Sequence, residues 1–161
     1  MSATALSQPK QIALTDLKEW ISTLEKEGEL SRVKAKVDWN LELGGIVQEN
    51  QDRKGPALLF ESIKDYENTL CKKFFTASLL TYPRIAMMMG LPKDTKPKEL
   101  IKIYMERLKN PIKPVLVKDG PVKENILTGR DIDLFQFPAP KWHALDGGRY
   151  IGTADVVITR D

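Results

Sequence analysis

Apolar residues at helical spacing predict an amphipathic helix close to the amino terminus. Four of them lie at positions i, i+3, i+4 and i+7 and so share one helical face: Leu17, Trp20, Ile21 and Leu24. Asp16 followed by Glu19 resembles a capping box, which satisfies the free backbone N–H groups of a first helical turn. Gly28 stands where a glycine commonly ends a helix. We therefore predict a helix that begins after Asp16 and ends before Gly28.

The pattern then changes, and it predicts two strands with a helix between them. Over residues 30–37 apolar positions alternate with basic ones, as in a half-buried strand: Val33, Ala35 and Val37 against Arg32, Lys34 and Lys36. Residues 41–53 form a second helical pattern, which spans Gly44 and Gly45 and rests on three apolar residues: Leu43, Ile46 and Val47. A Gly55-Pro56 turn then precedes the short apolar strand Ala57–Phe60.

The middle of the chain carries one more strand signal and two more helical patterns. Within the mixed segment 69–80, three residues favour a strand: Phe74, Phe75 and Thr76. Residues 83–89 favour a short helix that Gly90 closes. The strongest later helix covers residues 98–109, where Pro97 suits the first turn. Its apolar stripe consists of Leu100, Ile101, Tyr104, Met105 and Leu108.

Beyond Pro114 the helical patterns stop. Short β-like runs follow, separated by Pro and Gly turns: 115–117, 125–127, 132–137 and 150–159. We place a domain boundary near residue 114. Residues 1–11 are then a flexible tail, 12–114 an α+β domain and 115–161 the start of a second domain. The last strand of this stretch has no partner within it and would expose an unpaired edge, so we expect a partner chain or further polypeptide to complete the sheet.

Composition narrows the class of protein without showing its chemistry. The 161 residues are 42% hydrophobic and 29% charged, as in soluble globular proteins. The net charge of +3, from 25 basic and 22 acidic residues, does not favour nucleic acid or an anionic membrane as a partner. No apolar run approaches the ~18 residues that span a bilayer, and residues 1–11 lack the apolar centre of a signal peptide. A single cysteine, Cys71, excludes internal disulfides and cysteine-rich zinc sites, so we expect a reduced, cytoplasmic protein.

Two residues have the chemistry for acid–base or nucleophilic catalysis, and each has a simpler interpretation. His143 lies three residues before Asp146, a spacing that suits an acid–base couple. We favour a loop hydrogen bond instead, because the chain has no second histidine and no nucleophile lies close by. Cys71 precedes Lys72-Lys73, and neighbouring ammonium groups favour a reactive thiolate. No histidine lies near it in sequence to act as a base, so we favour a structural thiol.

Three further features have structural interpretations. Gly44-Gly45 and Gly147-Gly148 are too short for phosphate-binding loops; we interpret the first pair as a site of close packing and the second as a turn. Met87, Met88 and Met89 are interpreted as core residues. Residues 93–113 hold seven basic residues against three acidic ones, which we interpret as a solvated face. An RNA-binding module would need stacking aromatic residues beside these cations, and the nearby tyrosine belongs to the apolar stripe.

The chain carries an ordered string of short motifs. The later ones are Asp131-Ile132-Asp133-Leu134, Phe137-Pro138-Ala139-Pro140, Trp142-His143, Asp146-Gly147-Gly148-Arg149-Tyr150-Ile151-Gly152-Thr153 and Val156-Val157-Ile158-Thr159-Arg160-Asp161. The earlier ones are Asp16-Leu17-Lys18-Glu19-Trp20, Glu27-Gly28-Glu29-Leu30 and Gly55-Pro56-Ala57-Leu58-Leu59-Phe60-Glu61. Each motif alone is weak, but their joint order and spacing resemble the amino-terminal third of the UbiD family of decarboxylases, which use prenylated FMN.

The resemblance implies an enzyme that reversibly removes CO2 from an aromatic or α,β-unsaturated carboxylic acid, with the prenylated flavin as electron sink. It also implies a divalent metal, typically manganese, at the flavin phosphate, potassium in addition, and a Glu-Arg-Glu set that handles protons. Family members have a small α/β domain, a split β-barrel flavin domain and a carboxy-terminal oligomerisation domain. Residues 12–114 would be the first of these and 115–161 the opening of the second, and the complete enzyme would be a homo-oligomer.

The family's metal-ligating Asn and flavin-contacting Arg come shortly after the segment that ends at Asp161. We therefore expect no catalytic and no metal-binding residue in this chain, and no activity from it alone. Thr153 is the one position carried over as a flavin neighbour, with a plain strand residue as its alternative role. Two functions stand first: the amino-terminal part of a UbiD-type decarboxylase or carboxylase, completed by the rest of the enzyme or a companion subunit, or a non-catalytic assembly subunit. An RNA-binding module ranks last.

Overall fold

The computed structural model describes residues 14–152, which divide between two compact units. One unit joins residues 16–80 to residues 134–152, and we call it the α/β unit; the other comprises residues 81–133. Within the described range, four α-helices and one three-stranded sheet give an α+β fold, as predicted. The α/β unit is therefore discontinuous in sequence, and the second unit is inserted between its two parts along the chain.

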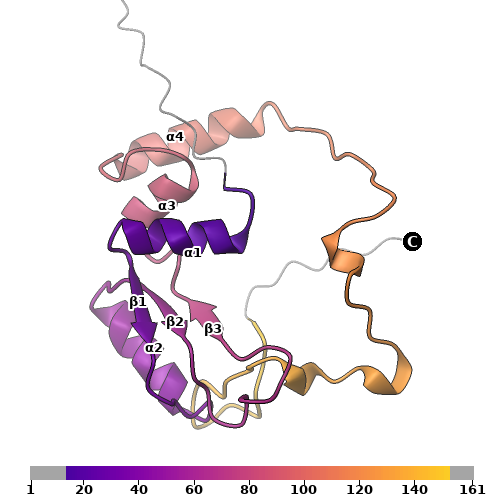
Figure 1. Cartoon of the computed structure of the whole chain (residues 1–161). Coiled ribbons are helices and arrows are strands. Elements are labelled where there is room, and N and C mark those ends of the chain that lie inside the picture. The colour runs from indigo at the N-terminus through magenta and orange to yellow at the C-terminus, as the bar shows by residue number, and fades with distance from the viewer. Residues whose placement is uncertain (1–13, 153–161) are drawn as a thin grey trace, which may run out of the picture. The chain divides into compact units, whose positions relative to one another are not determined.

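The sheet of the α/β unit has the strand order β1-β2-β3 (Figure 1). Strand β1 (Leu30–Val33) runs parallel to β2 (Ala57–Phe60), and β2 runs antiparallel to β3 (Phe74–Thr76). Helix α2 (Glu42–Asp52) forms the crossover that a parallel β1–β2 pair requires. The expected strand over residues 30–37 is shorter than predicted. After Val33 the chain leaves the sheet, and only Val37 returns, in an isolated parallel bridge with Ile63.

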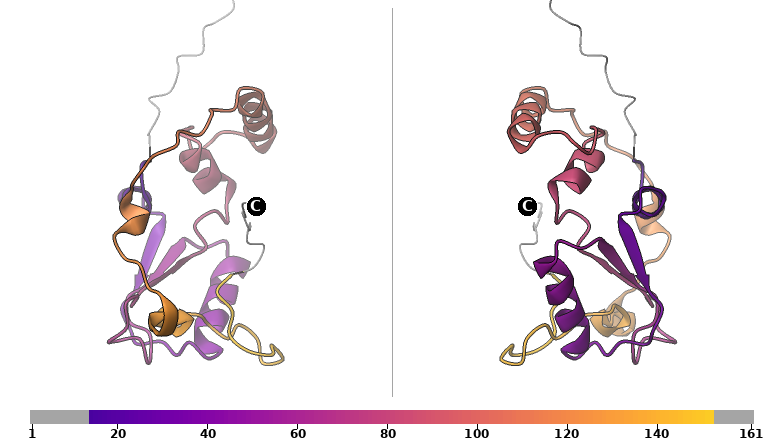
Figure 2. Two further views of the ribbon diagram at one scale, coloured as in Figure 1. Left: turned by 90° about the vertical axis from the view of Figure 1, so that its right-hand side faces the viewer. Right: turned by 90° about the vertical axis from the view of Figure 1, so that its left-hand side faces the viewer.

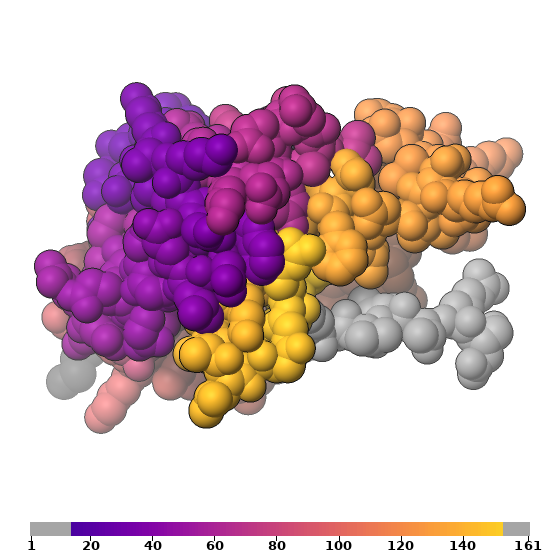
Figure 3. All heavy atoms as spheres, turned by 90° about the horizontal axis from the view of Figure 1, so that it is seen from below, coloured from indigo at the N-terminus to yellow at the C-terminus, as the bar shows by residue number. Residues whose placement is uncertain are grey.

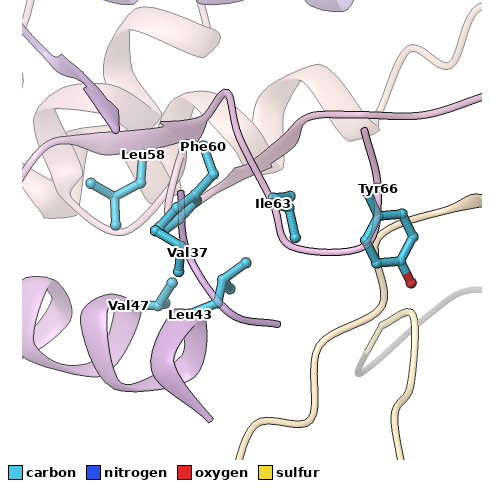
Figure 4. Close-up of a cluster of buried hydrophobic side chains, with 7 residues drawn as sticks. All are labelled: Val37, Leu43, Val47, Leu58, Phe60, Ile63 and Tyr66. Atoms are coloured by element: carbon cyan, nitrogen blue, oxygen red, sulfur yellow. The ribbon is translucent and has the colours of Figure 1, made fainter. Parts of the chain in front are cut away.

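The two faces of β2 bury different partners because successive strand residues point to opposite sides. Leu58 and Phe60 face α2 in a cluster of buried side chains: Val37, Leu43, Val47, Leu58, Phe60, Ile63 and Tyr66 (Figure 4). Ala57 and Leu59 are also buried, and alternation places them on the opposite face. Figure 2 shows α1 and α2 on the two sides of the strands, so the sheet is covered on both faces.

Helix α1 (Leu17–Lys26) forms where the periodicity predicts it. The Asp16 carboxylate accepts a hydrogen bond from the Glu19 backbone N–H at 2.8 Å, which caps the first turn. Gly28 has φ +70°, a conformation that glycine adopts without strain, and this ends the helix. Trp20 and Leu24 are buried, whereas Leu17 at the start of the stripe is 58% exposed.

Arg32 on β1 ties α1 to the sheet. Its Nε and Nη2 donate to the two carboxylate oxygens of Glu25 at 2.6 and 2.9 Å, and its Nη1 donates to Glu61 at 2.7 Å. The hydrogen bonds from Arg32 hold the pKa of the Glu25 carboxyl below its usual range. This bidentate geometry orients the helix across the face of the sheet that carries Leu59, the register partner of Arg32.

The second unit is built on two helices, α3 (Tyr82–Met88) and α4 (Pro97–Leu108). Gly90, with φ +69°, follows the end of α3 as predicted, and Arg107 on α4 donates to the Met89 carbonyl at 2.8 Å. The apolar stripe predicted for α4 is not a core stripe, because only Leu100 is buried. The other four members are 54–64% exposed: Ile101, Tyr104, Met105 and Leu108. Met87 is buried and Met88 is exposed, so the methionine cluster is only partly a core element.

The β-like runs predicted beyond residue 114 do not form strands in the described range. Residues 115–117 and 125–127 lie in exposed irregular chain, and the run 132–137 contains the short 3-10 helix η3 (Leu134–Gln136) instead. Two more 3-10 helices occur nearby, η1 (Pro121–Lys123) and η2 (Gly129–Asp131). A strand needs a hydrogen-bonding neighbour, and residues 115–133 have none in this unit. Of the run 150–159, residues 150–152 are irregular and the rest lies outside the described residues.

The compact units differ from the division expected near residue 114. Residues 134–152 pack with residues 16–80, so the α/β unit is not complete at residue 114. The boundary near 114 concerns the domains of a complete enzyme and stays a prediction, as does the flexible tail, which lies outside the described residues. Across residues 14–152, no helix combines the length and the apolar character needed to cross a bilayer.

We expect Leu58→Ala to lower the free energy of unfolding by about 2–5 kcal/mol, because it leaves a cavity between β2 and α2. Leu17→Ala is the matched control: the same atoms are removed from a side chain that is 58% exposed, and the change should stay within about 0.5 kcal/mol. Urea denaturation followed by tryptophan fluorescence measures both. Equal losses in the two variants would contradict the placement of the core.

Candidate functional site

Residues 134–152, which we call the return segment, lie against the amino-terminal part of the α/β unit (Figure 3). The Lys141 backbone N–H donates to the Trp39 carbonyl at 3.1 Å, and the Leu41 N–H donates to the Lys141 carbonyl at 3.0 Å. Next to η3, the Cys71 N–H donates to the Gln136 carbonyl at 3.2 Å. Pro138, Ala139 and Pro140 are buried between these two attachments. The return segment is thus held by backbone hydrogen bonds at both ends of a buried stretch.

Helix α2 approaches the return segment closely at Gly44. A Cβ at this position would lie 2.7 Å from the Trp142 carbonyl oxygen and 3.1 Å from its Cα, which no real side chain tolerates. At Gly45 a Cβ would meet nothing within 4 Å. The interpretation of this glycine pair as a site of close packing is confirmed, and it applies to Gly44 alone.

Beside the close approach at Gly44, the Trp142 ring packs against an aromatic side chain of the sheet. Trp142 meets Phe74 of β3 edge to face, with ring centroids 5.9 Å apart, a favourable arrangement for aromatic pairs. On its other side Tyr150 lies 6.4 Å away, centroid to centroid. The indole N–H of Trp142 is buried and has no hydrogen-bond acceptor among residues 14–152.

Arg149 fills a socket formed by three aromatic residues. Its Cζ lies 4.2 Å from the centroid of Trp39 and 4.3 Å from that of Phe135, so the guanidinium is sandwiched between two rings. Its Nη1 donates to the hydroxyl of Tyr66 at 3.1 Å, and Tyr66 is only 2% exposed. We call this arrangement the Arg149 clamp. Sequence reasoning did not single it out, since Arg149 and Tyr66 are 83 positions apart.

A surface recess of about 210 Å³ lies between α2 and the return segment, lined by Gly44, Val47, Gln48, Gln51, Trp142, His143 and Tyr150. Amide, imidazole and phenol groups line it alongside apolar surface, so it can offer hydrogen bonds to a small polar group. Glutamine and tyrosine are poor nucleophiles, and His143 supplies the one side chain of the set with a basic nitrogen. This set of groups fits binding better than covalent catalysis.

His143 makes the loop contact expected of it. Its backbone N–H donates to the Asp146 carboxylate at 2.9 Å, whereas its ring Nδ1 lies 3.6 Å from the same oxygen, beyond a hydrogen bond. The His143 side chain is 70% exposed. The carboxylate therefore shapes the turn before Gly147 and Gly148, which lie in a bend, and the loop interpretation is confirmed.

Cys71 is half-buried, and its Sγ lies 3.6 Å from the Lys73 carbonyl, within range of a weak S–H hydrogen bond. Its backbone N–H donates a hydrogen bond to the return segment, which fits a structural role for this residue. Thr153, the expected flavin neighbour, lies outside the described residues. Among the described residues no group of three or more His, Cys, Asp or Glu side chains is placed to hold a metal ion.

The loop that carries Trp39 is shaped by Asp38. Its carboxylate accepts from Lys64 Nζ at 2.6 Å and from the Asn40 N–H at 2.8 Å, while its own N–H donates to Glu42 at 2.7 Å. The hydrogen bond from Lys64, followed by that from Asn40, holds the pKa of Asp38 below its usual range. The same contact raises the pKa of Lys64. Next to it, Trp39 Nε1 donates to Asp65 at 3.0 Å, which fixes the ring beneath Arg149.

Two family models match consecutive parts of the chain. The amino-terminal domain of 3-octaprenyl-4-hydroxybenzoate carboxy-lyase (UbiD) matches residues 21–104, and the Rift-related domain of the same enzyme matches residues 113–161. The chain belongs to the UbiD family.

Named relatives and solved structures agree with this membership. The pyrrole-2-carboxylic acid decarboxylase of Pseudomonas aeruginosa is 34% identical over 86% of this chain and 29% of its own length. The phenolic acid decarboxylase of Bacillus subtilis is 36% identical over 93% of this chain and 32% of its own length. The closed form of the Sedimentibacter hydroxybenzoicus vanillic acid decarboxylase ShVdcCD superposes with a TM-score of 0.76 at 32% identity, over 86% of this chain and 29% of that one.

The UbiD-class enzyme HmfF from Pelotomaculum thermopropionicum, solved in complex with FMN, has a TM-score of 0.70 at 30% identity, covering 84% of this chain and 28% of that one. An evolved dimeric form of HmfF was solved with prenylated FMN. This UbiD-family chain spans about a third or less of the length of the curated relatives it matches, between 29% and 33%.

We expect Gly44→Ala to loosen the return segment, because its methyl group meets the Trp142 backbone; overpacking of this kind costs about 1–3 kcal/mol. Gly45→Ala is the matched control and should stabilise α2 by up to about 1 kcal/mol through helix propensity. Unfolding free energies and amide hydrogen exchange over residues 141–152 measure both effects. Stabilisation by both alanines would show that the close approach at Gly44 does not constrain the fold.

The Asp38–Lys64 pair predicts a pH dependence with a definite sign. The pKa of Asp38 is lower in the folded chain than in the unfolded one, so its contribution to stability is present above about pH 4 and is lost as the pH falls through the folded value. Lys64, with a raised pKa, contributes below about pH 10 and loses its contribution as the pH rises through its folded value. Asp38→Asn should therefore lose less stability between pH 5 and pH 3 than the unsubstituted chain, measured by urea denaturation. Asp94→Asn, an exposed aspartate of the other unit, is the control and should follow the unsubstituted chain.

Proposed function

We propose that this chain is the amino-terminal part of a UbiD-type enzyme that removes CO2 reversibly from an aromatic or α,β-unsaturated carboxylic acid with prenylated FMN. The observation that carries the proposal is the pair of family-model matches, which occur in order and cover residues 21–104 and 113–161. The relatives named above act on pyrrole-2-carboxylic and phenolic acids, which supports a planar, conjugated carboxylic acid as the substrate.

In this proposal residues 12–114 are the amino-terminal α/β domain and residues 115–161 open the split β-barrel flavin domain, whose return segment packs with residues 16–80. The exposure of apolar residues ahead of the return segment supports it: Ile112 and Leu116 are each 96% exposed, and Val122 is 87% exposed. Side chains of this kind are normally buried, so their exposure fits a stretch that further polypeptide covers. Thr153 would then lie next to the flavin.

Prenylated FMN, when bound, supplies the electron sink for loss of CO2. We propose that the metal is manganese and that it and potassium are held by residues of the remaining part of the enzyme, as the family resemblance implies. We propose that the chain is cytoplasmic and that it joins a homo-oligomer once the enzyme is complete. The described residues hold and orient the chain that enters the flavin domain.

The test is co-expression with a carboxy-terminal companion that carries the remaining part of the family sequence, in cells supplied with prenylated FMN. We expect co-purification of the two chains, a flavin absorbance spectrum, and exchange of labelled CO2 into an aromatic acid. Thr153→Val should weaken flavin binding, whereas Thr128→Val, in the exposed chain ahead of η2, should not. A folded complex that binds no prenylated FMN would contradict the proposal.

A non-catalytic assembly subunit is the second candidate. The exposed apolar stripe of α4 favours it, because a folded helix presents four large apolar side chains to a partner: Ile101, Tyr104, Met105 and Leu108. In that case the chain would co-purify with a full-length UbiD-type enzyme that is active without it, and flavin content would not depend on Thr153.

A further inference from the structure

Two consecutive residues at the end of the return segment are held by different parts of the α/β unit. Arg149 lies between the rings of Trp39 and Phe135, 4.2 and 4.3 Å from their centroids. Its neighbour Tyr150 is placed beside Trp142, and its backbone N–H reaches the Pro140 carbonyl at 3.4 Å. Two successive anchors on separate partners fix both the position and the direction of a chain, whereas one anchor leaves it free to rotate.

The partners of Arg149 are themselves rigidly placed. Trp39 is fixed by the hydrogen bond from its Nε1 to Asp65 and by the hydrogen bond that its carbonyl accepts from the Lys141 backbone N–H. Tyr66 is 2% exposed within the main hydrophobic cluster. The socket is therefore anchored to the folded core through Tyr66, with Trp39 held by hydrogen bonds beside it.

No carboxylate among residues 14–152 pairs with Arg149, so the two rings and the Tyr66 hydroxyl are what holds the guanidinium. A cation between two aromatic faces is more strongly attracted when it is partly removed from water, and Arg149 is half-buried. Arginine suits this socket better than lysine, because its planar group stacks on both rings and still donates to Tyr66. The residue type thus fits a positioning role.

We propose that Arg149 is a positioning residue: the Arg149 clamp fixes the position and direction of residues 149–152 within the α/β unit, and flavin binding by the complete enzyme depends on this placement. This inference rests on the proposed function, in which Thr153 lies beside the flavin.

The first arm of the test uses the chain itself and needs no flavin. In Arg149→Met, amide hydrogen exchange over residues 141–152 should become about five- to thirtyfold faster, from loss of the cation–π and hydrogen-bond contacts, while β2 and α1 exchange as before. Arg149→Lys should restore part of the protection. Arg53→Met is the matched control, because it removes an equal charge from an exposed arginine that pairs with Glu49 on α2.

Phe135→Leu keeps the test decisive if Arg149→Met unfolds the unit. Phe135 is 61% exposed, so its replacement removes one ring of the clamp with little effect on the core, and it should produce a smaller increase in exchange over the same residues. Unchanged exchange in all the clamp variants would overturn the inference.

The second arm uses the enzyme completed by its carboxy-terminal companion. Arg149→Met should raise the apparent dissociation constant for prenylated FMN by at least about threefold and broaden the bound flavin spectrum, since only the correctly oriented fraction of the chain binds. Arg149→Lys should lie between. A variant with faster exchange but unaltered flavin affinity and spectrum would overturn the positioning role and leave the proposed function intact. Failure of the unsubstituted complex to bind flavin would overturn the proposed function and this inference with it.

Discussion

The contact between the Gly44 backbone and the Trp142 backbone is the constraint on which the rest of the α/β unit depends. With no side chain at position 44, helix α2 comes close enough for the Trp142 ring to meet Phe74 at the edge of the sheet. Tyr150 lies against the Trp142 ring in this position. The preceding residue, Arg149, lies in the socket formed by Trp39, Phe135 and Tyr66. A β-carbon at position 44 would separate the two segments and undo these contacts together.

Local patterns were enough to predict most helices and strands of the α/β unit. Helix α1, with its Asp16 cap and Gly28 end, follows from periodicity and capping chemistry, which act within a few residues. Strand β2 follows from a short apolar run. The close packing at Gly44 was predicted because a glycine inside a helix lowers helix stability and so needs another reason to be there. The strand over residues 30–37 was predicted too long, because its pairing depends on where β2 ends, at Phe60, and not on its own alternation.

Contacts between distant residues were beyond the reach of the sequence patterns. The Arg149 clamp joins residues from three segments. No local sequence pattern predicts that an arginine will bind between aromatic side chains. The opposite error occurred in α4, where a regular apolar stripe predicted burial but only Leu100 is buried. Periodicity shows which face of a helix prefers to be covered; it does not show whether the covering surface is part of the same chain. The strands predicted at 115–117, 125–127 and 132–137 are absent for the same reason, since a strand depends on its hydrogen-bonding neighbour.

Early and late motifs of the family resemblance lie in the same folded unit. The early string 55–61 forms β2, and part of the later one, Pro138 to Tyr150, forms the return segment that closes the α2 side of the same unit. Trp142 and Arg149 of the later motifs contact residues of the amino-terminal part that lie outside the early motifs: Gly44, Phe74, Trp39 and Tyr66. Residues 109–133, by contrast, contribute exposed apolar side chains and no strand. The described residues therefore combine an α/β unit with a buried hydrophobic cluster and, over residues 112–127, an apolar stretch whose large side chains are mostly exposed.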